Sequence, residues 1–173
     1  MKKLVFYVVM IFCGLPNVSA GCSEKEVDAV EVDNGTLTGY WKLLEGASLT
    51  KKSKDGDWVQ TATIKPGVFA YEFKPDNTFI SYDLTGNFPA AKGTWKLDVK
   101  SQTGKEIGSA GLFLYSDNFK DIADTDALET DGAMKFQLSI KGGRLHLVSK
   151  EIALGGSGKY PYMRNEMTFV QGK

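Results

Sequence analysis

Few side chains of this sequence could carry out covalent or metal chemistry. Its 173 residues include one histidine, His146, and two cysteines, Cys13 and Cys22. His146 lies between Leu145 and Leu147, and alternate residues of a strand point to opposite faces. If the leucines point into a core, the histidine faces solvent. Zinc normally requires several His or Cys ligands, so we expect no metal or haem site at His146.

The segment GGSGK, residues 155–159, has the composition of a phosphate-binding loop but lacks two of its defining residues. Ala153 stands where such a loop needs its first glycine, and Tyr160 replaces the Ser or Thr that would hold Mg²⁺. We therefore interpret this segment as a flexible glycine loop.

Carboxylates are numerous, but their spacing selects no site. Acidic residues crowd residues 117–131 without the Asp-x-Asp-x-Asp-Gly pattern of a calcium loop, so we expect a solvated acidic face. Glu72 with Asp83 or Glu151 could form a carboxylate pair of the kind that glycoside hydrolases use, yet nothing in the sequence favours either pair. No reactive constellation can be assembled, and we expect neither an enzyme nor a cofactor.

The first 21 residues have the three-part layout of a secretory signal peptide. Lys2 and Lys3 precede an uninterrupted apolar run over residues 4–15, and small residues follow. That run is too short to cross a membrane, which needs about 20 residues. We expect a signal peptide at residues 1–21 and an exported protein.

Two cleavage sites are compatible with the segment that follows. Cleavage after Ala20 would leave a soluble periplasmic protein with a free thiol. Alternatively, Ala20-Gly21-Cys22 resembles the end of the bacterial lipobox, although Ser19 replaces its usual leucine-like residue. Cys13 is removed with the signal peptide, so the mature chain cannot form a disulfide, and its single cysteine favours lipidation. The resemblance implies acyl chains such as palmitate on Cys22 and an anchor in the outer membrane, on its periplasmic or surface side.

The composition of the mature chain limits its partners. Removal of residues 1–21 leaves 19 basic residues against 21 acidic ones. A net charge near −2 without a dominant basic patch argues against nucleic acid. About 150 residues suit one domain. Residues 22–36 are acidic and poor in large apolar side chains, so we expect a flexible tether there and one folded domain over residues 37–173.

From residue 37 onward the pattern alternates apolar and polar residues with the period of two that is typical of β-strands. The segments 93–99 and 134–140 are clear examples among roughly nine that are rich in β-branched and aromatic residues. Turn residues at 75–77 and 141–143 suit antiparallel hairpins. One short helix is expected near 117–126, where apolar residues have helical spacing.

This pattern predicts an all-β fold, either a closed antiparallel up-and-down barrel or two stacked sheets. Closure removes exposed strand edges, which favours the barrel. The alternative, an immunoglobulin-like sandwich, lacks its paired cysteines and central tryptophan.

The segments Gly39–Leu43 and Gly93–Leu97 carry a resemblance to a known family. The first resembles the Gly-x-Trp motif that opens lipocalins and their calycin relatives. The pair is similar to the lipocalin-like domains of Gram-negative bacterial lipoproteins, which typically carry a second Gly-Thr-Trp. The resemblance covers residues 37–171. It implies structural roles for Gly39 and Trp41, with Arg164 packed over Trp41, because a guanidinium can lie flat on an indole.

A lipocalin-like barrel implies binding without turnover. An interior lined with aromatic rings suits a small hydrophobic ligand. The inward-facing candidates are Phe69, Tyr71, Phe73, Tyr82, Trp95 and Phe136. If these rings instead fill the barrel, Tyr160 and Tyr162 offer the alternative of a surface module whose exposed loop aromatics bind a glycan or another envelope protein.

Overall fold

The computed structural model describes residues 29–30, 32–87, 89–99, 109–119, 125–154 and 161–172. Almost all of the secondary structure in these ranges is β-strand. The elements are β1 (Ala29–Val30), α1 (Asn34–Leu37), β2 (Gly39–Lys51), β3 (Val59–Ile64), β4 (Phe69–Phe73), β5 (Thr78–Asp83), β6 (Ala91–Asp98), β7 (Ser109–Tyr115), the 3-10 turn η2 (Thr125–Ala127), β8 (Met134–Lys141), β9 (Arg144–Ser149), β10 (Ile152–Ala153) and β11 (Tyr162–Gln171).

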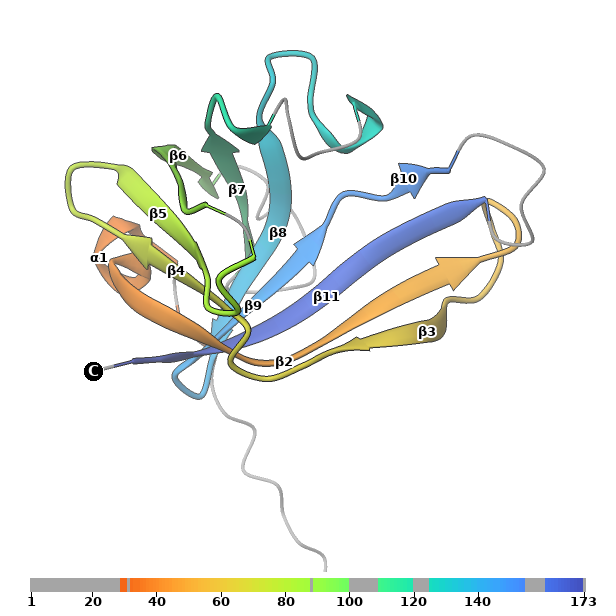
Figure 1. Ribbon diagram of the computed structural model, residues 1–173, viewed down its shortest axis with the longest axis horizontal. Helices are drawn as coiled ribbons and strands as arrows, with labels where there is room; N and C mark the ends of the chain where they lie inside the picture. The colour runs from red at the N-terminus through yellow and green to blue at the C-terminus, as the bar shows by residue number, and fades with distance from the viewer. Residues whose placement is uncertain are drawn as a thin grey trace, which may run out of the picture.

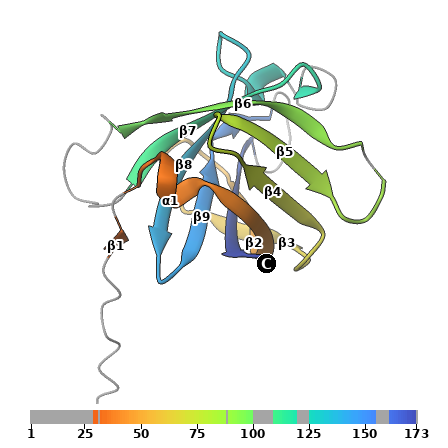
Figure 2. The same ribbon diagram turned by 90° about the vertical axis from the view of Figure 1, so that its left-hand side faces the viewer.

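Eight strands within these ranges form a closed antiparallel barrel (Figure 1, Figure 2). They follow the order β2-β4-β5-β6-β7-β8-β9-β11, so neighbours in the barrel are successive along the chain except for the insertions β3 and β10. The last strand returns to the first, pairing from Tyr162 opposite Lys51 to Gln171 opposite Trp41. The all-β, up-and-down barrel predicted from the sequence is confirmed, and the architecture is consistent with a lipocalin-like fold.

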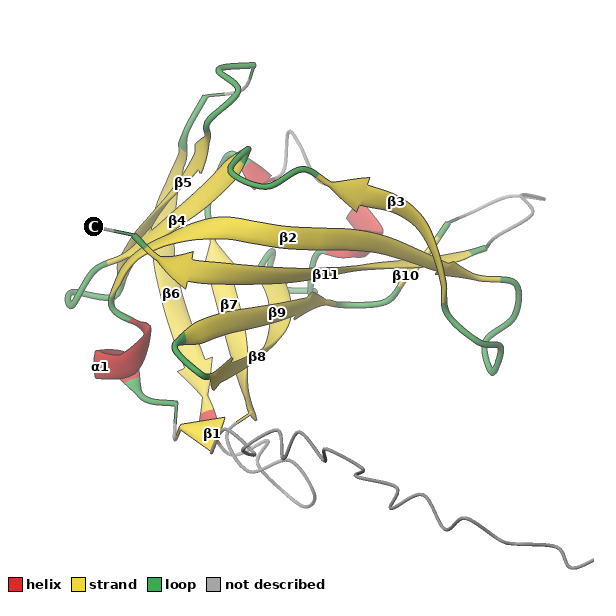
Figure 3. Cartoon of the chain, turned by 90° about the horizontal axis from the view of Figure 1, so that it is seen from below, coloured by secondary structure: helices red, strands yellow, loops and turns green. Residues whose placement is uncertain are grey.

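Strands β2 and β11 continue beyond the barrel wall. There they form a four-stranded sheet with β3 on one side and β10 on the other, in the order β10-β11-β2-β3, which we call the extension (Figure 1, Figure 3). The pairing of β2 shifts register between Ser48 and Leu49, and that of β11 between Thr168 and Phe169. Such irregularities bend a strand and increase its twist, which lets one pair of strands serve both the barrel and the extension.

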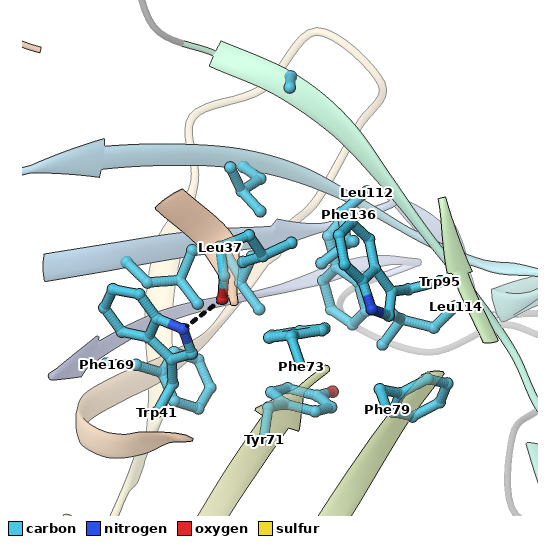
Figure 4. Close-up of a cluster of buried hydrophobic side chains, with 14 of the residues drawn as sticks. Leu37, Trp41, Tyr71, Phe73, Phe79, Trp95, Leu112, Leu114, Phe136 and Phe169 are labelled. Carbon is cyan, nitrogen blue, oxygen red and sulfur yellow. Dashed lines mark hydrogen bonds between the residues drawn. The ribbon is translucent and has the colours of Figure 1, made fainter. Parts of the chain in front are cut away.

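Aromatic side chains fill the part of the barrel that lies toward α1 (Figure 4). Tyr71 stacks on Phe73 with ring centroids 5.5 Å apart, and Phe73 meets Trp95 edge to face at 5.9 Å. Each such pair contributes about 0.5–1.5 kcal/mol beyond simple burial. The buried rings are Trp41, Tyr71, Phe73, Phe79, Trp95, Phe119, Phe136 and Phe169.

The segment before β2 closes this end of the barrel. Asp33 caps α1, because its carboxylate accepts a hydrogen bond from the Thr36 amide (2.7 Å) while the Thr36 hydroxyl accepts one from the Asp33 amide (2.9 Å). Leu37 is fully buried, and its carbonyl accepts a hydrogen bond from the Trp41 indole N–H at 2.7 Å. Val32 is also fully buried. We call this the closed end.

The folded domain therefore begins earlier than the sequence indicated. The composition of residues 22–36 predicts a flexible tether, whereas Ala29 and Val30 pair with Lys141 and Ile140 of β8. The acidic composition of this segment concealed one buried valine and a four-residue helix. Residues 1–28, which include the predicted signal peptide and Cys22, lie outside the described residues.

The short helix predicted near residues 117–126 is visible in part. The amide of Phe119 bonds the carbonyl of Ser116 at 3.1 Å, and η2 forms one 3-10 turn at Thr125–Ala127. Residues 120–124 lie outside the described ranges. Phe119 is buried and stacks on Phe79 with centroids 6.0 Å apart, so this connection covers part of the aromatic core.

The Gly-Thr-Trp motif at residues 93–95 requires glycine at position 93, because the backbones of β6 and β7 approach closely there. A Cβ atom added there would lie 1.8 Å from the carbonyl oxygen of Tyr115 on β7. We predict that Gly93→Ala lowers the free energy of unfolding by about 2–4 kcal/mol, because a main-chain carbonyl cannot move aside as a side chain can. The measurement is urea unfolding followed by far-ultraviolet circular dichroism.

Gly111→Ala on β7 is the matched control. The nearest atom to its added Cβ is a ring carbon of Phe113 at 3.2 Å, which can shift. We expect a loss below about 1 kcal/mol. Equal losses for the two variants would show that the contact of β6 with Tyr115 is not the constraint.

Candidate functional site

The end of the barrel opposite α1 holds a pocket of about 480 Å³. Gly39 pairs with Phe73 beside α1, whereas Phe69 pairs with Asp83, and Ser81 with Ala91, at the other end. We call this other end the mouth. The extension leaves the barrel on this side (Figure 1).

Five barrel strands supply the inner wall of the mouth pocket. Strand alternation directs a side chain of each of these strands into the pocket. The lining side chains are Leu43 of β2, Phe69 of β4, Ser81 of β5, Ala91 of β6 and Met167 of β11. Two of the five, Ser81 and Ala91, are small. The pocket exists because small side chains at the mouth cannot fill the space that phenyl and indole rings fill at the closed end.

Connections complete the rim of the mouth pocket. Ile64 and Val68 flank the turn between β3 and β4, and Pro89 precedes β6. Gly46 permits the approach of Ile64, since a Cβ there would lie 3.1 Å from the Cβ of Ile64. Apolar side chains therefore predominate on both the wall and the rim.

Polar groups lie on one side of the mouth pocket, at the end of β5. The carboxylate of Asp83 accepts hydrogen bonds from the Thr85 amide (2.9 Å), the Thr85 hydroxyl (2.6 Å) and the Asn87 amide (3.0 Å), which fixes the turn after β5. Ser81 is 7% exposed, and its hydroxyl has no hydrogen-bond partner among the described residues. This hydroxyl can therefore donate or accept a hydrogen bond inside the pocket.

The predicted lining residues divide between the core and the mouth pocket. Tyr71, Phe73, Trp95 and Phe136 point inward as predicted, but they pack in the core rather than line the pocket (Figure 4). Burial raises the pKa of the Tyr71 phenol above its ordinary value. Of the six residues proposed from the sequence, Phe69 alone lines the mouth pocket.

The predicted inward orientation of Tyr82 is wrong. On β5 the buried residues are Phe79 and Ser81, and Tyr82 lies on the outer face near Tyr40, with ring centroids 5.9 Å apart. Its hydroxyl donates a hydrogen bond to the carboxylate of Glu72 at 2.6 Å. Both faces of this strand carry large apolar side chains, so alternation did not decide between them. The pairing of Phe79 with the inward-facing Phe73 decides the orientation of β5, because it places Phe79 on the inner face.

The predicted packing of Arg164 over Trp41 is also wrong. The Arg164 guanidinium carbon lies 4.4 Å from the ring centroid of Trp58, a residue in the connection between β2 and β3. Trp41 is instead closed off by Leu37. Arg164 lies on β11 within the extension, opposite Leu49, and that position is remote from the closed end.

The surface aromatics also differ from the expectation. Tyr162 is the first residue of β11 rather than a loop residue, and the ammonium group of Lys51 lies 5.3 Å from its ring centroid. Tyr160 and the glycine loop at 155–159 lie outside the described residues.

His146 faces outward as expected, with Nδ1 3.2 Å from the Thr168 hydroxyl. Burial is the main cause that lowers its pKa.

Two carboxylates of the acidic segment at residues 117–131 bind other groups of the protein. Glu129 forms an ion pair with Lys150 at 3.3 Å, and Asp131 accepts a hydrogen bond from the Tyr115 hydroxyl at 3.0 Å. In the part of the chain that the structure describes, no group of three or more His, Cys, Asp or Glu side chains is arranged to hold a metal ion.

None of the helices in the described ranges has the length and apolar character needed to span a membrane.

No protein-family model matches this chain, and no curated protein matches it either. The class is therefore defined by architecture: an eight-stranded closed antiparallel barrel with an apolar pocket at one end.

The outward orientation of Tyr82 can be tested by titration. The hydrogen bond to Glu72, followed by burial, raises the pKa of Tyr82 to about 12. A raised pKa means that the bond stabilises the fold fully below about pH 10, the ordinary tyrosine value, and that this stabilisation is lost as the pH rises through about 12. We predict that Glu72→Gln lowers the pKa of Tyr82 toward 10, measured from tyrosine ¹³Cζ chemical shifts.

Tyr115 provides the internal control, because burial and, second, the hydrogen bond to Asp131 raise its pKa independently of Glu72. Its titration should be the same in both proteins. A Tyr82 titration that Glu72→Gln leaves unchanged would contradict the observed orientation.

Proposed function

We propose that this protein is a non-catalytic binding module that holds a small hydrophobic molecule in the mouth pocket. The observation that carries the proposal is an apolar pocket of about 480 Å³ in a barrel whose other end is packed. Ligand sites typically occupy about 300–1,000 Å³ and combine apolar walls with a few polar groups. The hydroxyl of Ser81, a largely buried residue that lines the pocket, supplies such a group and would orient a ligand that carries a hydroxyl or carbonyl.

The energetics of burial support an apolar ligand of modest size. Burying one methylene group contributes about 0.8 kcal/mol. A micromolar Kd corresponds to a binding free energy of about 8 kcal/mol, which roughly ten buried methylene groups supply. Additional buried groups are needed to offset the translational freedom that the ligand loses on binding. The side chains of Leu43, Val68, Phe69 and Met167 offer the complementary surface.

We further propose that the protein is exported and anchored to the outer membrane through acyl chains on Cys22. The support is the signal-peptide pattern and the single cysteine of the mature chain. Ala29 lies seven positions after Cys22 in the sequence, and seven residues reach at most about 25 Å. Because Ala29 pairs with Lys141 at the closed end, such an anchor would hold the closed end toward the membrane and leave the mouth accessible.

Filling the mouth pocket should weaken ligand binding. We predict that Val68→Trp weakens binding of N-phenyl-1-naphthylamine, a neutral apolar fluorescent probe, at least tenfold, because the indole would occupy the pocket. The measurement is a fluorescence titration of the purified mature protein, accompanied by native mass spectrometry of the protein as it leaves its host to detect a retained small molecule.

Val59→Trp is the matched control, since Val59 is 51% exposed on β3 and does not line the mouth pocket. It should bind the probe as the unmodified protein does. Equal binding by both variants, or no binding by the unmodified protein together with no retained molecule, would refute the proposed function.

The anchor is tested separately by mass spectrometry of the N-terminal peptide. We predict that the mature chain begins at Cys22 and carries the mass of acyl chains, which supply about 0.8 kcal/mol per buried methylene. Cys22→Ser should release the protein from the membrane fraction. A mature chain that begins at Gly21, with an unmodified thiol, would contradict lipidation.

A further inference from the structure

A second pocket, of about 330 Å³, lies on the outer face of the barrel. Lys135 and Gln137 of β8 point outward here, as Phe136 between them points into the core. The pocket lies where the extension leaves the wall, because β11 contributes Arg164 and the connection before β3 contributes Trp58. Side chains from separate segments thus converge on one site, which we call the outer pocket.

Cations hold the Trp58 ring that forms one wall of the outer pocket. Its centroid lies 4.4 Å from the Arg164 guanidinium carbon and 4.6 Å from the ammonium nitrogen of Lys51. Lys51 is only 6% exposed and forms an ion pair with Glu151 at 2.7 Å. A half-buried indole between the sheet and solvent, fixed by two cations, offers an ordered apolar surface to a ligand.

Charges around the outer pocket are paired except for one. Besides the pair of Lys51 with Glu151, Lys150 pairs with Glu129 at 3.3 Å. Arg164 pairs with Glu166. Lys135 has no carboxylate partner among the described residues, and its ammonium group lies 5.3 Å from the ring centroid of Phe113. The ion-paired charges around the outer pocket cancel, so its net charge is the single positive charge of Lys135.

The chemistry of this lining excludes several ligand classes. An apolar ligand would remove ammonium and carboxylate groups from water without compensation. A compact multivalent anion would meet Glu129 and Glu151, and a cation would meet Lys135 and Lys150. Sugar hydroxyls both donate and accept, as this lining requires, and Trp58 can contact the C–H face of a sugar ring.

We propose that the outer pocket binds an acidic sugar, a hydroxylated ring that carries a single carboxylate. The carboxylate pairs with the Lys135 ammonium, the ring lies against Trp58, and the hydroxyls bond the flanking charged groups. This site is independent of the occupant of the mouth pocket, since the two pockets share no lining residue.

The test uses the fluorescence of Trp58. Trp41 and Trp95 are each 3% exposed, so a neutral quencher such as acrylamide reaches Trp58 preferentially. We expect galacturonate, titrated into the mature protein at low ionic strength, to protect Trp58 from acrylamide at concentrations about tenfold lower than galactose. A charge-assisted hydrogen bond is stronger than a neutral one, which is the reason for this preference.

Lys135→Met should reduce the preference for galacturonate over galactose to nearly one. Lys92→Met is the matched control, because Lys92 is an exposed lysine on β6 that does not line the outer pocket. It should retain the tenfold preference. Thermal unfolding of both variants checks that the fold is intact.

Three results would overturn the proposal. They are equal protection by galacturonate and galactose, protection by inorganic sulfate as strong as that by galacturonate, and no protection by any of the three. The first removes the role of the charge, the second indicates a site for a bare anion, and the third indicates no site. Binding of the apolar probe at the mouth pocket is unaffected by each of them.

Discussion

The pairing of β11 with β2 is the interaction on which the rest of the structure depends. It spans the whole of β11, from Tyr162 to Gln171, and it closes the barrel by joining the last strand to the first. Closure satisfies the backbone groups that would otherwise form two open edges. It also fixes which residues of every other strand face inward, because the remaining strands pair in succession around the wall.

Packing inside the closed wall is uneven, and this unevenness separates the residues that stabilise the fold from those that line the mouth pocket. Near α1 the interior is filled by rings such as Phe73 and Trp95, which contact each other edge to face. Toward the mouth, Ser81 and Ala91 occupy positions where a ring would fill the space. A substitution in the aromatic core therefore acts on folding, whereas one at the mouth acts on the pocket, a division that the proposed function requires.

The same strands present opposite chemistries on their two faces. On β11, Met167 lines the mouth pocket inside the barrel, and Arg164 lines the outer pocket on the other face. Strand alternation makes this possible, because neighbouring residues of one strand point to opposite sides of the wall. The extension adds a further surface, since it places Trp58 over the outer face of the sheet, against Arg164. A barrel of this kind can hold an apolar group inside and a polar group outside without competition between them.

The sequence by itself determined the strands, the hairpin turns, the closed all-β architecture and the burial of Trp41, because these follow from local alternation and turn chemistry. Tertiary structure alone decided the direction of Tyr82, whose strand has large apolar residues on both faces, and the partner of Arg164, which a distant connection supplies. It also decided the position of both pockets. A pocket is space that side chains leave empty, and that space depends on register and on the neighbours that pairing brings together across the barrel, which no local pattern of residues specifies.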